Sequence, residues 1–195
     1  MRRTQSSLLR PSILTCLTFA GLAVNSAAGA VCTDPNTCFG TGALQSNTTG
    51  EFNSAFGFEA LSANTSGTFN TASGYWALLA NTSGNQNTAH GANALRSNTT
   101  GGSNTATGNS ALSSNTTGGS NTASGDFALF SNTIGFGNTA TGHRAMFANR
   151  TGEANTAHGL GAMEGNTSGD YNTASGWSAL LYHDGDSNTA LGAFS

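Results

Sequence analysis

Glu153 and Asp170 are the two residues whose types and spacing could support catalysis. They lie 170 − 153 = 17 residues apart. In a stack of coils of that length, their Cα atoms would be about 4.8 Å apart on adjacent layers. Carboxyl groups at that distance can perform acid–base or glycosidase chemistry. No surrounding residues indicate a pocket, so we expect a solvated pair or an incidental cation site. We predict that the protein is not an enzyme and has no catalytic residue.

The histidines are the next candidate ligands for a metal. His90 and His158 occupy equivalent positions of the pattern described below, and four layers would place them about 19 Å apart. That distance is too long for one metal ion to bind both. His143 is nearer to His158 but lacks a third ligand. We therefore expect no metal site and no cofactor.

Two cysteines, Cys32 and Cys38, flank a short loop near the start of the mature chain, whereas Cys16 lies in a predicted export signal. An exported protein meets oxidising conditions, which favours a Cys32–Cys38 disulfide over free thiols. Their spacing is not that of a Cys-x-x-Cys redox motif. We interpret residues 31–39 as an N-terminal cap that this disulfide would pin.

These residues must be positioned by a repeat that begins at Gly40. The pattern Gly-x-x-Ala-Leu-x-x-Asn-Thr-Thr/Ser-Gly-x-x-Asn-Thr-Ala-x recurs every 17 residues, and one late unit lacks a residue. A fixed short period indicates that each unit is one layer of a stack, because one unit alone cannot bury its apolar side. We therefore assign residues 40–195 to a repeat domain.

Residues 1–30 resemble an export signal, with a basic start at Arg2 and Arg3, an apolar run, and an Ala-x-Ala sequence ending at Ala30. The apolar run is short for a membrane span, and no later segment is as apolar. Removal of residues 1–30 leaves three arginines and nine acidic residues, a formal charge of 3 − 9 = −6. Nucleic-acid binding requires a basic surface, so we exclude it. We expect an exported protein with no transmembrane segment in the mature chain.

Each unit contains two segments that we expect to be extended, exemplified by Ala77–Leu79 and Asn87–His90. Glycine-containing turns separate them, and 17 residues are too few for two helices. Stacked strands would give a rod about 43 Å long. Columns of Ala and Leu would form its apolar core, and two columns of Asn would form amide ladders between the coils.

The segment Asn70–Leu78, with the sequence Asn-Thr-Ala-Ser-Gly-Tyr-Trp-Ala-Leu, resembles the head repeats of YadA-like trimeric autotransporter adhesins. Similar repeats occur in phage tail-fibre-like proteins, although the better-known head repeat is shorter. The resemblance covers roughly residues 39–195. It implies an all-β, left-handed parallel β-roll or β-solenoid of about nine coils that assembles as a homotrimer. It also implies a location at the bacterial cell surface, associated with the outer membrane or secreted, and attachment to an extracellular matrix protein, a glycan or a cell surface.

Aromatic residues occupy variable positions of the repeat, where they could contact a partner. Packing between chains or over coil edges is the alternative, because apolar residues usually serve packing. The candidate partner contacts are Tyr75, Trp76, Phe127, Phe136, Tyr171 and Trp177.

Ranks of threonine suggest another function for the same fold. One rank runs from Thr71 to Thr189 and another from Thr48 to Thr167. On a flat solenoid face they could order water, as in ice-binding β-solenoids, although threonine also simply favours strands. A phage tail-fibre-like structural rod is the remaining alternative.

Overall fold

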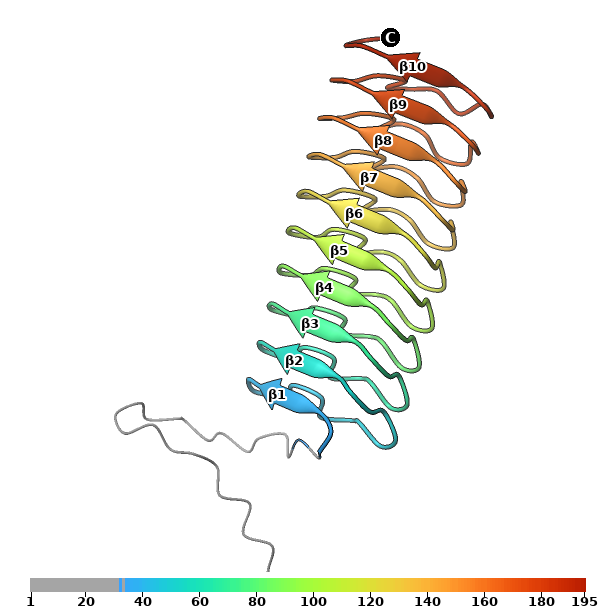
Figure 1. Ribbon diagram of the computed structural model, residues 1–195. Helices are drawn as coiled ribbons and strands as arrows, with labels where there is room; N and C mark the ends of the chain where they lie inside the picture. Colours follow the sequence, from blue (N-terminus) through green and yellow to red (C-terminus); the bar gives the residue numbers. More distant parts are fainter. Residues whose placement is uncertain (1–31, 33) are drawn as a thin grey trace, which may run out of the picture.

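A computed structural model describes residue 32 and residues 34–195, which form a stack of coils joined by one parallel sheet (Figure 1). The sheet has ten strands in chain order, so each strand pairs with the strand of the next coil. The predicted export signal at residues 1–30 lies outside the described residues, as do residues 31 and 33 of the predicted cap. The strands are β1 (Thr37–Phe39), β2 (Ser54–Phe56), β3 (Thr71–Ser73), β4 (Thr88–His90), β5 (Thr105–Thr107), β6 (Thr122–Ser124), β7 (Thr139–Thr141), β8 (Thr156–His158), β9 (Thr173–Ser175) and β10 (Thr189–Leu191).

The sequence prediction of an all-β parallel solenoid of about nine 17-residue coils is confirmed. Pairing is in register, as in β4 and β5, where Thr88, Ala89 and His90 face Thr105, Ala106 and Thr107. Successive strand side chains point to opposite faces. The central alanine of β2 to β9 is therefore buried, while most of the flanking residues are exposed.

The prediction of a second extended segment in each coil is wrong. Ala77–Leu79 lies in a run of turns, and each described coil carries a single three-residue strand. Ala77 and Leu78 are both fully buried, which two consecutive residues of a strand facing one core cannot be. Leu78 instead adopts a left-handed conformation with φ of 51°, which returns the chain toward the interior.

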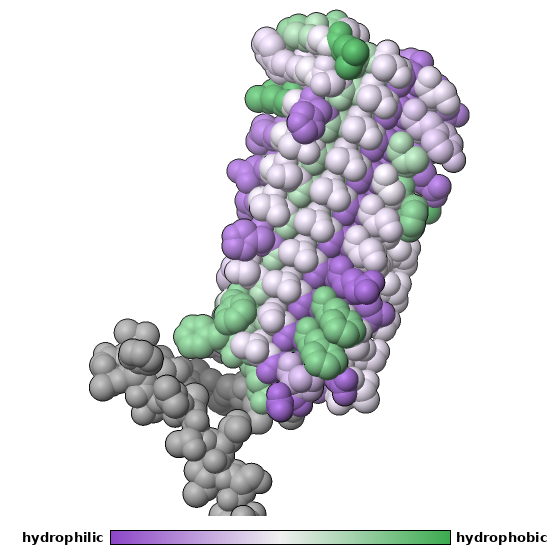
Figure 2. Space-filling model, viewed as in Figure 1, coloured by the Kyte–Doolittle hydropathy of each residue, from purple (hydrophilic) through white to green (hydrophobic). Residues whose placement is uncertain are grey.

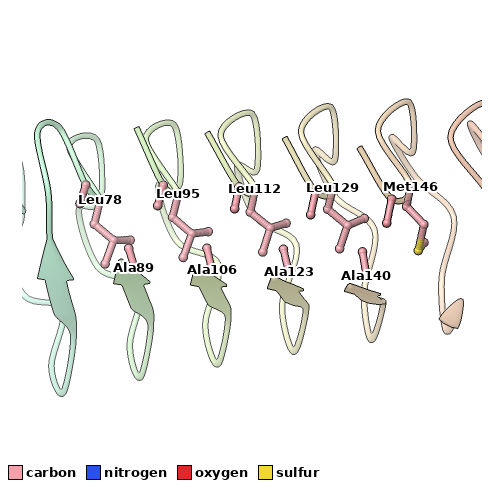
Figure 3. Packing of buried hydrophobic residues seen from close by; sticks show 14 of the residues in the cluster. Leu78, Ala89, Leu95, Ala106, Leu112, Ala123, Leu129, Ala140 and Met146 are labelled. Atoms are coloured by element: carbon pink, nitrogen blue, oxygen red, sulfur yellow. The ribbon is translucent and has the colours of Figure 1, made fainter. Parts of the chain in front are cut away.

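Burial explains why leucine occupies a conformation that bulky residues disfavour. The left-handed region costs an L-residue about 1–2 kcal/mol, whereas burying a leucine side chain contributes about 1.5–3 kcal/mol. Figure 3 shows these side chains pointing from the turn segment toward the strand alanines, as Leu112 does toward Ala123. The alanine and leucine columns are thus buried within one chain, with Met146 and Met163 continuing the leucine column.

Backbone hydrogen bonds join the coils around their perimeter and not only at the strands. In the third coil, the N–H of Leu78 donates to the Ala94 carbonyl of the next coil at 3.0 Å, and the N–H of Trp76 donates to the Phe58 carbonyl of the preceding coil at 3.0 Å. The turns therefore satisfy their polar backbone groups by stacking, as strands do.

Two buried asparagine ladders run through the stack, as the sequence predicted. In the first ladder, Asn115 Nδ2 donates to Asn98 Oδ1 at 2.7 Å and to the Gly118 carbonyl at 2.9 Å. In the second ladder, the Asn104 backbone N–H donates to Asn87 Oδ1 at 3.0 Å. These side chains occupy the interior as structural groups, and apart from Asn166 Oδ1 their buried amide groups are paired with one another and with backbone groups.

The repeating glycines permit the coils to approach one another closely. Gly108 has φ of +130°, and a Cβ at this position would lie 2.6 Å from the carbonyl oxygen of Gly125 in the next coil. A side chain there would both strain the backbone and collide with it. The glycine column therefore sets how tightly the coils stack.

Candidate functional site

The predicted carboxylate pair, Glu153 and Asp170, lies on adjacent coils, and the Asp170 carboxylate hydrogen bonds to the backbone of Glu153. The N–H of Glu153 donates to Asp170 Oδ1 at 2.7 Å, and the N–H of Asp170 donates to Asp186 Oδ1 at 2.8 Å. The Asp170 and Asp186 carboxylates thus each accept from the residue at the equivalent position of the preceding coil. This arrangement extends the stacking pattern along an outer edge of the rod.

Asp184 performs a related structural role where the repeat is one residue short. Its Oδ1 accepts from the N–H groups of Thr167 at 2.7 Å, Ser168 at 2.7 Å and Gly169 at 3.2 Å, and its Oδ2 accepts from Thr167 Oγ1 at 2.6 Å. In most other coils a threonine carbonyl receives the equivalent bonds, and in one coil the Arg150 carbonyl does. The Thr167 hydroxyl and these N–H groups lower the pKa of Asp184 to about 2.

His90 and His158 lie four coils apart in the sheet. His90 ends β4 and His158 ends β8, and both are exposed. His143 instead meets the edge of the Phe127 ring, with 6.2 Å between ring centroids. Within residue 32 and residues 34–195, no group of three or more histidine, cysteine, aspartate or glutamate residues could hold a metal ion.

The N-terminal cap joins the first coil through a disulfide and an asparagine. Cys32 and Cys38 are disulfide-bonded, with 5.8 Å between their Cα atoms. Asn36 Nδ2 donates to the Gly50 carbonyl at 2.8 Å, and Asn36 Oδ1 accepts from the N–H of Asn53 at 2.8 Å. An open hollow of about 170 Å³ lies beside this cap and is lined by Asp34, Pro35, Asn36, Thr48, Thr49, Gly50 and Glu51.

The predicted contacts Tyr75 and Trp76 belong to what we call the N-terminal aromatic cluster, formed by Phe58, Glu59, Tyr75, Trp76 and Arg96. Tyr75 stacks on Phe58 with 5.4 Å between centroids and is tilted against Trp76 at 4.4 Å. Trp76 Nε1 donates to Glu59 Oε2 at 2.8 Å. The Arg96 guanidinium lies over the indole, 4.6 Å from the ring centroid.

The predicted contact Phe127 is half-buried in a second group, which we call the central aromatic cluster. Its rings come from consecutive coils, and Phe130 stacks on Phe147 with 5.2 Å between centroids. Arg144 lies over Phe147 at 4.4 Å and forms an ion pair with Glu164 at 2.6 Å. The members are Phe127, Phe130, His143, Arg144, Phe147 and Glu164.

Phe136, Tyr171 and Trp177 are each more than half exposed and lie outside these two clusters. Trp177 contacts Phe194 of the last coil with 4.6 Å between centroids. The six predicted contacts therefore occupy several positions along the rod and do not form one site. Figure 2 shows apolar side chains that interrupt rows of polar ones near both ends of the rod.

The aromatic residues at variable positions also include Phe52 and Phe69, which lie one 17-residue period apart. Their rings stack with 5.0 Å between centroids, and both are exposed. Sequence reasoning did not select Arg96 and Arg144, which lie over aromatic rings. Spacing could not have found these arginine contacts, because they join different positions of the repeat.

The two threonine ranks have different environments. Thr48 Oγ1 donates to the Thr65 carbonyl of the next coil at 2.8 Å, and later members of that rank repeat this bond. The other rank begins each strand from β3 onward and is mostly exposed, as at Thr105 and Thr122. Among the described residues, the hydroxyls of this second rank have no hydrogen-bond partner.

Comparison with known proteins identifies no relative: no family model, curated protein or solved structure matches the chain. In the described part of the chain, no helix is long and apolar enough to cross a membrane.

Proposed function

We propose that the chain is an exported binding rod that attaches to an extracellular matrix protein, a glycan or a cell surface, in the manner of an adhesin. One observation carries this proposal: exposed aromatic residues occupy variable positions on a scaffold whose buried positions barely change. Tyr75 and Trp177 are about half exposed, whereas nearby column members such as Ala77 and Ala179 are fully buried. The outer surface can therefore vary without disturbing the stack.

The composition of these variable positions supports binding. Tyrosine, tryptophan and arginine are the residue types enriched among those that contribute most to protein interfaces. Here they are held by cross-coil contacts, such as the stack of Phe58 on Tyr75. A side chain already held in place loses less conformational entropy when a partner binds.

We also propose that the protein is a homotrimer at the bacterial surface or secreted, as the resemblance to adhesin heads implies. One chain already buries its alanine and leucine columns. Association would therefore use outer faces, including the exposed rings. Light scattering coupled to size-exclusion chromatography measures the mass directly: a trimer supports this part of the proposal, and a folded monomer contradicts it.

The binding function is tested by applying the mature protein to surfaces coated with collagen, fibronectin, laminin or arrayed glycans. A variant with Tyr75→Ser and Trp177→Ser removes exposed rings from two regions of the rod. A matched control with Asn109→Ser and Thr117→Ser changes polar residues on the same scaffold. We expect wild type and control to bind and the aromatic variant to lose binding. Equal binding by all three proteins, or none by any, would refute the proposal.

A water-ordering function is a second candidate, favoured by the exposed threonine rank whose hydroxyls have no partner in the described residues. The strands repeat every ~4.8 Å along the stack, so these hydroxyls form a regular row. The test is inhibition of ice recrystallisation. Thr122→Tyr should abolish inhibition, whereas Thr100→Tyr, in an exposed turn, should preserve it; a wild type without activity removes this candidate.

A further inference from the structure

Positive charge is scarce in this chain, and its placement is informative. There is no lysine, and the described residues contain nine acidic residues but only the arginines Arg96, Arg144 and Arg150. Arg144 is neutralised by Glu164 at 2.6 Å. Within the described residues Arg96 has no ion pair and its side chain is exposed. Its charge is therefore available to an anion.

Contacts from neighbouring coils hold the Arg96 side chain in position. The guanidinium lies 4.6 Å from the centroid of Trp76, and the Trp76 indole is anchored by its hydrogen bond to Glu59 at 2.8 Å. A cation over an aromatic face is attracted by the ring quadrupole. The planar guanidinium still presents N–H donors, whose geometry suits two oxygens of a carboxylate.

Tyr75 supplies an adjacent aromatic surface. Its ring stacks on Phe58 with 5.4 Å between centroids and is tilted by 37° against Trp76 with 4.4 Å between centroids. The residue at the same position in the next coil is Ala92, so no ring from that coil continues the stack. Tyr75 is 47% exposed. The exposed part of the Tyr75 ring is therefore not covered by a ring of the next coil, and a flat apolar group could contact it.

We propose that Tyr75, Trp76 and Arg96 bind a saccharide that carries carboxylate groups. The C–H face of a sugar ring is apolar and packs against an aromatic ring, while its carboxylate accepts from Arg96. The Glu59 carboxylate and the Tyr75 hydroxyl lie in the same cluster and offer hydrogen-bonding groups for sugar hydroxyls. This inference rests on the proposed binding function and names its ligand class.

The experiment is a calorimetric titration of the mature protein with an oligogalacturonate and with its fully methyl-esterified form, which has the same backbone without charge. Arg96→Gln removes the proposed carboxylate ligand, and Arg150→Gln is the matched control, because Arg150 is also an exposed arginine outside any described ion pair. Loss of a charge-assisted hydrogen bond should weaken binding by about tenfold. Tyr75→Ala should weaken binding of the acid by a similar factor of about ten.

The expected result is binding of the acid, at least ten times weaker binding of the ester (about 1.4 kcal/mol), and an Arg150→Gln variant that matches wild type. Equal losses from Arg96→Gln and Arg150→Gln would show nonspecific attraction of an anion and overturn the inference. Absence of binding to the acid would overturn it as well. Wild type that adheres to matrix proteins but not to the acid would refute this ligand class while leaving the binding function intact.

Discussion

Replacing Asn115 with alanine should destabilise the rod because the asparagine ladder has a direction. Asn115 Nδ2 donates to Asn98 Oδ1 of the preceding coil at 2.7 Å, and among the described residues no other donor reaches that oxygen. Asn98 is fully buried. The substitution would therefore leave a buried acceptor without a partner.

The other groups that bond to Asn115 keep a partner in the variant, so the loss of stability can be assigned to the unpaired Asn98 Oδ1. Asn132 Nδ2 retains the Gly135 carbonyl at 3.2 Å, and the Gly118 carbonyl retains Asn104 Nδ2 at 2.9 Å. A buried unsatisfied polar group costs about 1–3 kcal/mol. With the packing lost around the amide, we expect Asn115→Ala to reduce the free energy of unfolding by about 2–4 kcal/mol.

Asn47 provides a control within the same ladder because it is the first member. It accepts from Asn64 Nδ2 at 2.8 Å, and Asn64 keeps its bond to the Gly67 carbonyl at 3.1 Å. Its own acceptor, the Gly50 carbonyl, also receives Asn36 Nδ2. No partner loses its last hydrogen bond, so Asn47→Ala should cost less than about 1 kcal/mol.

Denaturant unfolding followed by circular dichroism measures both variants, with Asn109→Ala as a control for the same change at an exposed site. Repeat proteins can unfold in segments, so hydrogen exchange of the coils around Asn115 should accompany the titration. The reasoning fails if Asn115→Ala costs no more than Asn47→Ala. Asn166 already shows the state that Asn115→Ala would create at Asn98. Its Oδ1 is buried and has no partner among the described residues, because His183 stands where the next asparagine of the ladder would be.

Two further predictions concern the glycine column and the carboxylate near the C-terminal end. Gly108→Ala should reduce the free energy of unfolding by more than about 3 kcal/mol, because the added Cβ would lie 2.6 Å from the Gly125 carbonyl oxygen. Gly102→Ala is the control and should cost much less, because a Cβ there would lie 3.2 Å from its nearest atom, the Asn85 carbonyl oxygen. The pKa of Asp184 is lowered from 3.8 to about 2, so ionised Asp184 stabilises the fold above about pH 4 and this contribution disappears as pH falls through about 2. Asp184→Asn should therefore speed hydrogen exchange of the Thr167 amide at pH 7, and the difference from wild type should shrink below pH 4; a difference independent of pH would contradict this assignment.

The 17-residue period was sufficient to predict the stack, because residues that recur at a fixed interval must occupy equivalent positions in successive layers. Asn98 and Asn115 could be placed in one ladder from spacing alone, and so could Glu153 and Asp170. Spacing also separated His90 from His158. These predictions depend only on which residues share a column.

What happens within a coil could not be obtained in the same way. Leu78 belongs to a residue type that disfavours the left-handed conformation, and the expected strand there is replaced by turns because both Ala77 and Leu78 must face the core. Likewise, the contact of Arg96 with Trp76 joins different positions of the repeat across coils. The 17-residue period determined the layers and which residues share a column. The tertiary structure decided how each coil is bent and which columns contact one another, because the bend and these contacts depend on core packing around the whole coil.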